Sequence, residues 1–120
     1  MTLFLIYLGR VLLALCFVYA GLRNFAKLDL HTGILAKKGV PLPRAVLIAG
    51  LLVQVGGGLS VALGVFPAIG AAGLIVFTLA ASALYHDFWA YAGAERGPHI
   101  NAWLTNLALI GGFLLVIALA

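Results

Sequence analysis

Long apolar runs separated by short polar stretches dominate the chain. The runs cover about residues 3–22, 44–63, 67–85 and 101–119. A helix needs about 20 consecutive apolar residues to cross a bilayer, so each run is long enough to span it once. The pattern predicts an all-α membrane protein in which one transmembrane domain, residues 1–120, forms a bundle of four transmembrane helices.

The first polar stretch, residues 23–42, has a helical pattern of its own. Residues at the spacing of one helix face recur within it: Leu28, His31, Ile34 and Leu35. Asp29 is placed to cap the start of this helix, and Gly39 to end it. The segment is too short to span the membrane. We therefore expect a short interfacial helix that lies on the bilayer surface or folds back against the bundle.

The other connections carry their own signals. Gly64 follows the second run and Pro67 opens the third, the arrangement of glycine after one helix and proline at the start of the next. The second and third spans should therefore form a tight antiparallel hairpin. Asn101 is expected to cap the fourth span, and we expect the first and fourth spans to be neighbours in the bundle.

Composition supports a membrane protein and limits where a site can lie. Of the 120 residues, 65% are hydrophobic and 8% are charged, whereas a soluble domain carries roughly 25% charged residues. Four spans leave no room for a separate soluble domain, so a site must be made by the helices and their short connections. The net charge of +4 indicates contact with the lipid bilayer, and no nucleic acid is expected as a partner.

The basic residues also predict an orientation. Six of them lie in or beside the loops 23–42 and 86–100: Arg23, Lys27, Lys37, Lys38, Arg44 and Arg96. The opposite side carries none. The positive-inside rule places both loops in the cytoplasm and both termini outside, in a multi-pass protein of the bacterial inner membrane.

Two polar residues fall inside the apolar runs. Arg10 lies about 12 residues from the loop end of the first span, and Gln54 about 11 residues from the same end of the second. Both should therefore be roughly 17 Å deep at 1.5 Å per residue, and we expect them to be in contact. The contact is interpreted either as an internal structural hydrogen bond or as part of a ligand or proton pocket. Snorkelling of Arg10 to the outer face is the third interpretation.

A second polar group falls near one membrane depth on the loop side. Arg23 and Lys27 end the first span, and His86, Asp87 and Asn106 lie where the third and fourth spans meet that side. Basic residues are common at a membrane interface, but histidine, acid and amide are denser here than anchoring requires. His86 beside Asp87 can exchange protons near neutral pH. An apolar pocket with polar groups at its mouth suits an amphiphile such as a quinone.

Redox and metal chemistry are restricted by the remaining residues. Cys16 is the single cysteine, so the chain has no internal disulfide and no CxxC pair. That excludes the dithiol–quinone chemistry of disulfide-generating membrane enzymes. The three histidines, His31, His86 and His99, match no standard ligand spacing, and no metal site is expected.

Several short motifs occur in a recognisable order along nearly the whole chain. They are Gly9-Arg10-Val11-Leu12, Phe17-Val18-Tyr19-Ala20-Gly21-Leu22 followed by Lys27, Lys38-Gly39-Val40-Pro41, Gly57-Gly58-Leu59, Ala62-Leu63-Gly64, His86-Asp87-Phe88-Trp89 and the run from Asn106 to Gly112. In order and spacing they resemble the DoxX family of small bacterial membrane proteins. The resemblance implies a four-helix membrane bundle. It carries no settled catalytic residues, so catalysis by this chain stays open.

The resemblance also suggests a function. Some relatives are named as a subunit of thiosulfate:quinone oxidoreductase, and others are associated with oxidative-stress proteins. We therefore expect a quinone-interacting membrane subunit of a redox or oxidative-stress system, with reductant chemistry on a membrane or peripheral redox partner. The candidate quinone pocket comprises Arg10, Arg23, Lys27, Gln54, His86, Asp87 and Asn106. Two alternatives remain: a non-enzymatic assembly or anchoring protein with glycine-rich faces, and a small transporter acting as a homo-oligomer.

Overall fold

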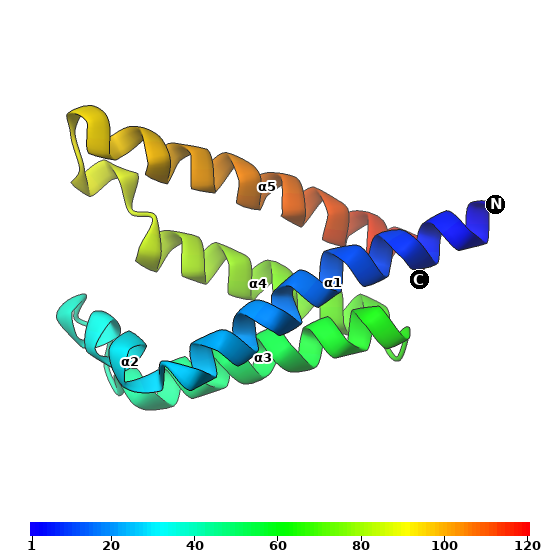
Figure 1. Ribbon diagram of the computed structural model, residues 1–120, viewed down its shortest axis with the longest axis horizontal. Coiled ribbons are helices and arrows are strands. Elements are labelled where there is room, and N and C mark those ends of the chain that lie inside the picture. The colour runs from blue at the N-terminus through cyan, green and yellow to red at the C-terminus, as the bar shows by residue number, and fades with distance from the viewer.

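A computed structural model covers residues 1–120 and contains helices only. Four helices are long and apolar enough to cross a membrane, which confirms the all-α expectation. The helices follow one another along the chain as Figure 1 shows: α1 (Thr2–Ala26), α2 (Leu28–Lys37), α3 (Pro43–Leu63), α4 (Pro67–Tyr85), the short 3₁₀ turns η1 (Phe88–Ala90) and η2 (Gly93–Glu95), and α5 (Arg96–Leu119).

The spanning helices pack in the order α1, α3, α4, α5. Each supplies at least one fully buried side chain to a shared core: Ala14, Val61, Ala71, Leu74 and Phe113. Glycine lets the backbones approach closely, since a Cβ on Gly58 would lie 2.7 Å from Val18 Cγ2, and one on Gly70 would lie 2.9 Å from the Gly57 carbonyl oxygen. Close approach through small residues is typical of membrane helices.

The bundle is closed at one end and open at the other. α1 and α5 meet where Phe17 packs edge-to-face on Phe113, with ring centroids 5.1 Å apart, and where Leu13 lies against Gly112. From there the two helices diverge (Figure 1). The expectation that the first and fourth spans are neighbours therefore applies only to the end that holds the α3–α4 turn, which we call the turn side. The opposite end, with α2 and the α4–α5 connection, is the loop side.

The amphipathic α2 folds back against the bundle. Its Leu35 is buried against Leu47 and Leu51 of α3, as the spacing of its apolar face predicts. Gly39 follows the helix with a φ of +81°, a left-handed conformation that glycine adopts without strain. Asp29 does not cap the helix, which begins at Leu28 without a side-chain cap.

Two helix ends differ from the expected spans. α1 continues to Ala26, a turn beyond the expected end at residue 22. α5 begins at Arg96, so Asn101 lies inside the helix and does not cap it. The α3–α4 turn agrees with the prediction, because Gly64 ends α3 with a φ of +73° and Pro67 opens α4.

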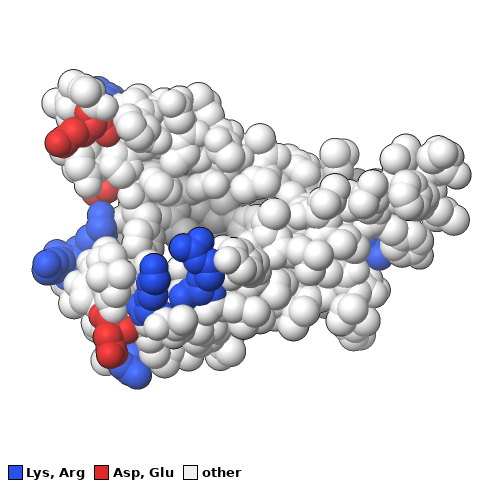
Figure 2. Space-filling view, viewed as in Figure 1, with Lys and Arg blue, Asp and Glu red and all other residues white.

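The charged side chains are concentrated at one end of the long axis of the molecule. Figure 2 shows nearly all visible Lys, Arg, Asp and Glu side chains at the loop side. The three acids, Asp29, Asp87 and Glu95, belong to α2 and the α4–α5 connection. Arg10 is the exception, since it contacts the turn side at Gly64. The chain is thus a multi-pass membrane protein with one highly charged end.

Candidate functional site

A cavity of about 520 Å³ lies in the loop-side half of the bundle. Its walls come mainly from α1 to α4, and most of them are apolar, Leu47, Leu51 and Phe77 among them. Six polar side chains join these walls: Asn24, His31, Gln54, Tyr85, His86 and Asn106. The space-filling view also shows the molecule hollowed between its two halves (Figure 2). The volume falls within the range of about 300–1,000 Å³ that small-molecule sites occupy.

Gln54 is the deepest polar group of the cavity wall. Its side chain is 4% exposed, and its Oε1 is buried with no hydrogen-bond partner. α1 approaches closely here, since a Cβ on Gly21 would lie 3.3 Å from that oxygen. A buried polar atom without a partner destabilises the folded protein. The amide is therefore a group that a bound ligand can satisfy.

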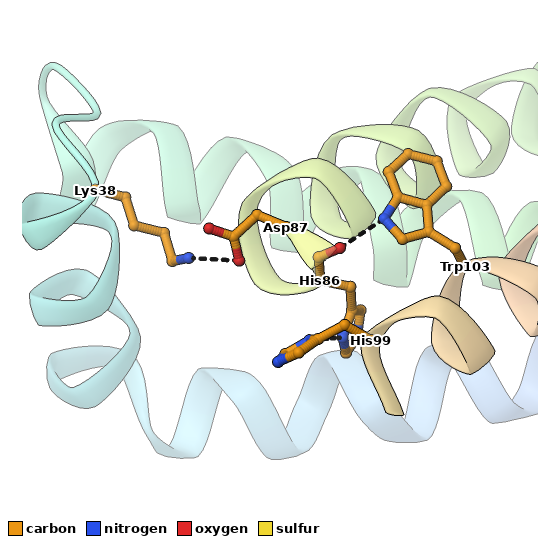
Figure 3. Close-up of polar contacts among 5 residues, drawn as sticks. All are labelled: Lys38, His86, Asp87, His99 and Trp103. Atoms are coloured by element: carbon orange, nitrogen blue, oxygen red, sulfur yellow. Dashed lines mark hydrogen bonds and ion pairs between the residues drawn. The ribbon is translucent and has the colours of Figure 1, made fainter. Parts of the chain in front are cut away.

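Two polar contacts hold α2 against the end of α4. His31 Nδ1 lies 3.0 Å from the hydroxyl oxygen of Tyr85, and the two rings meet edge-to-face. The Lys38 ammonium donates to an Asp87 carboxylate oxygen at 3.3 Å (Figure 3). His31 and Tyr85 both line the cavity, so α2 forms one of its walls.

The two histidines of the α4–α5 connection lie side by side. His86 Nδ1 is 3.3 Å from His99 Nδ1 (Figure 3), and the Trp103 indole N–H donates to the His86 carbonyl oxygen at 2.6 Å. Tyr91 stacks on His99, with ring centroids 4.3 Å apart. Two imidazole nitrogens share a hydrogen bond only when at least one ring is neutral. His99 is thus placed to pass a proton to His86, which lines the cavity.

His86 and Asp87, the pair expected to exchange protons, have different side-chain partners. His86 ends α4, and its side chain faces His99, whereas Asp87 faces Lys38 of the α2 terminus (Figure 3). The two neighbouring side chains point in different directions because the backbone leaves the helical path after Tyr85. His99 takes the place that the sequence interpretation gave to Asp87.

The predicted contact between Arg10 and Gln54 is wrong. The Arg10 guanidinium lies over the Tyr7 ring, 4.7 Å from its centroid, and a Cβ on Gly64 would be 2.7 Å from its Nη2. Gln54 and Gly64 are about 15 Å apart along a helix that rises 1.5 Å per residue. The register of α1 against α3 places Gly21, not Arg10, opposite Gln54.

The seven predicted pocket residues fall into three groups: those that line the cavity, one that lies beside it and those that lie outside it. Gln54, His86 and Asn106 line the cavity, and Asn106 also donates to the Ser82 hydroxyl at 2.7 Å, which joins α5 to α4. Asp87 lies beside the cavity in its ion pair. The other three lie outside its walls: Arg10 at the turn side, and the exposed Arg23 and Lys27 on and just after α1.

Sequence reasoning missed the role of α2 in this site. The spacing places His31 on the same face of α2 as the buried Leu35, but it does not place that histidine in the candidate pocket. That shared face was the available signal, since a histidine on a buried face needs a polar partner. The partner, Tyr85, lies 54 residues away along the chain, and no local pattern relates the two.

Comparison with known proteins agrees with this architecture. The family model described as DoxX matches residues 5–87. Over 113 residues the chain is 28% identical to the inner membrane protein YphA of Escherichia coli (strain K12), an alignment that covers 93% of this chain and 80% of the relative. No solved structure gives a significant match. Because the family match covers well over half of its residues, this chain belongs to the DoxX family.

Proposed function

We propose that this protein binds a quinone in the loop-side cavity, as a membrane component of a redox or oxidative-stress system in the bacterial inner membrane. The observation that carries the proposal is Gln54, a buried amide with an unpartnered oxygen in an otherwise mainly apolar wall. A primary amide both donates and accepts. It can donate to a quinone carbonyl, and it can accept from the hydroxyl of the reduced form.

The cavity suits the remaining chemistry of a quinone. Its apolar walls match an apolar ring and tail, while Tyr85 and His86 supply polar contacts nearer the loop side. Reduction of a quinone takes up two electrons and two protons. In this proposal the electrons come from a membrane or peripheral redox partner, and the His86–His99 pair conducts protons from the charged loop side.

The alternative assembly role has less support. It rests on glycine-rich faces that bind other membrane helices. Gly57, Gly58 and Gly70 serve contacts inside the bundle, because a Cβ on any of them would meet an atom of another spanning helix at 3.0 Å or less. Those glycines are not available to a partner, and the cavity therefore favours ligand binding.

Titration with a quinone analogue in detergent tests the proposal. Gln54→Met and His86→Ala each remove one polar contact, and the affinity should fall about three- to tenfold, the value of one hydrogen bond. Lys27→Ala is the matched control, since Lys27 is exposed outside the cavity, and its affinity should equal that of the wild type. Circular dichroism shows whether each variant is folded. Absence of binding, or equal binding by all four folded proteins, would contradict the proposal.

A further inference from the structure

A second cavity, of about 460 Å³, lies on the turn side between the N-terminal half of α1 and the C-terminal part of α5. Most of its lining is aliphatic: Leu5, Ile6, Leu13, Leu115, Val116 and Leu119. Gly9 and Gly112 widen it, and Arg10 is the one charged residue in its wall. We call it the Arg10 groove.

Arg10 has no counter-ion. Its Nε is buried without a hydrogen-bond partner, and the two ion pairs of the protein, Lys38–Asp87 and Arg44–Asp29, are both on the loop side. The remaining acid, Glu95, lies in η2. A positive charge within an apolar setting favours an anion strongly. No Asp or Glu side chain lies on this side of the protein and neither ion pair includes Arg10, so we look for the anion outside the chain.

The guanidinium lies near the level of lipid headgroups. α3 and α4 contain 21 and 19 residues, which gives lengths of about 31 and 28 Å at 1.5 Å per residue. Each length matches the roughly 30 Å hydrocarbon core of a bilayer. The turn between them therefore lies at the edge of the core, and Arg10 is in contact with Gly64 of that turn.

We propose that the Arg10 groove binds an anionic phospholipid of the leaflet that faces the α3–α4 turn. The phosphate accepts hydrogen bonds from the guanidinium, whose planar fork suits phosphate oxygens, and one acyl chain lies along the aliphatic wall. A second copy of the chain is a poorer occupant, because no Asp or Glu side chain of this protein lies on the turn side. This site is separate from the quinone cavity and independent of the function proposed for it.

Native mass spectrometry of the full-length protein, loaded from equal amounts of phosphatidylglycerol and phosphatidylcholine with the same acyl chains, tests the proposal. The wild type should retain phosphatidylglycerol preferentially. Arg10→Leu should reduce that preference about fivefold, the effect of one basic residue near an anionic bilayer surface. Arg23→Leu is the control, because Arg23 is on the same helix but outside the groove, and it should leave the preference unchanged.

Gly9→Leu blocks the groove without removing the charge. No atom lies within 4 Å of a Cβ placed on Gly9, and leucine favours the helix more than glycine does, so the variant should fold. It should lose retained phosphatidylglycerol as Arg10→Leu does. Wild-type retention by folded Gly9→Leu or Arg10→Leu would overturn the proposal. So would an equal loss in Arg23→Leu, a bound free fatty acid in place of phospholipid, or a dimer with an empty groove.

Discussion

The substitution Gln54→Met tests two effects of the buried amide: its cost to the stability of the folded protein and its contribution to ligand binding. Methionine is unbranched and similar in length to glutamine, so Gln54→Met keeps the contact with Gly21 and leaves no void. It removes the buried oxygen that has no hydrogen-bond partner. The folded state should then become more stable, while the cavity loses the amide that a ligand would use.

The size of the effect follows from the burial of the amide. An unsatisfied buried polar atom costs about 1–3 kcal/mol in a soluble protein. Polar groups within membranes contribute less, on average about 0.6 kcal/mol, because the unfolded chain also finds partners there. Gln54→Met should therefore raise the free energy of unfolding by about 1 kcal/mol. Affinity for a quinone analogue should fall about three- to tenfold in the same protein.

Reversible unfolding by SDS in mixed micelles, followed by circular dichroism, measures the change in the free energy of unfolding. Thr78→Val is the matched control, since Thr78 is also buried in a spanning helix but its hydroxyl donates to the Leu74 carbonyl oxygen at 2.7 Å. That variant should gain no stability and should bind the analogue normally. The reasoning fails if Gln54→Met loses 1 kcal/mol or more and retains full affinity, because the amide would then be structural.

Three other properties can be tested on the same protein. Cysteines introduced within 30–40 and 90–98 should resist a membrane-impermeant label in intact cells, as the positive-inside rule predicts; labelling of either loop from outside would reverse the orientation. The His86–His99 contact should be lost at a pH low enough to protonate both rings, seen as a difference between the NMR pH titration of the His86 ring in the wild type and in His99→Ala. Gly58→Val should reduce the free energy of unfolding by about 1–3 kcal/mol, since its Cβ would lie 2.7 Å from α1; unchanged stability would contradict the packing.

Local patterns predicted the elements of the fold well. The turn at Gly64 and Pro67 depends on backbone preferences of two residues, and the buried face of α2 depends on spacing alone. Both features depend on a few residues close together in the chain, so a single sequence is enough to predict them. The resemblance to the DoxX family separately implied the four-helix membrane bundle.

The candidate site was predicted less well because it depends on how distant helices align. Equal distances from the loop end placed Arg10 beside Gln54, but the helices align through the contact of Gly58 with Val18. That contact, together with an α1 one turn longer than expected, moves Arg10 to the turn side. No single-sequence pattern reports such a register, since it arises from packing between segments 40 residues apart.

Mass spectrometry of the lipid extract from gently purified protein tests quinone binding without a chosen analogue. We expect quinone to co-purify with the wild type and with Lys27→Ala, and to be depleted in Gln54→Met, whose amide is removed from the cavity wall. The comparison should be made on equal amounts of folded protein prepared from the same membranes. Quinone at the same background level in all three preparations would contradict a quinone site in this cavity.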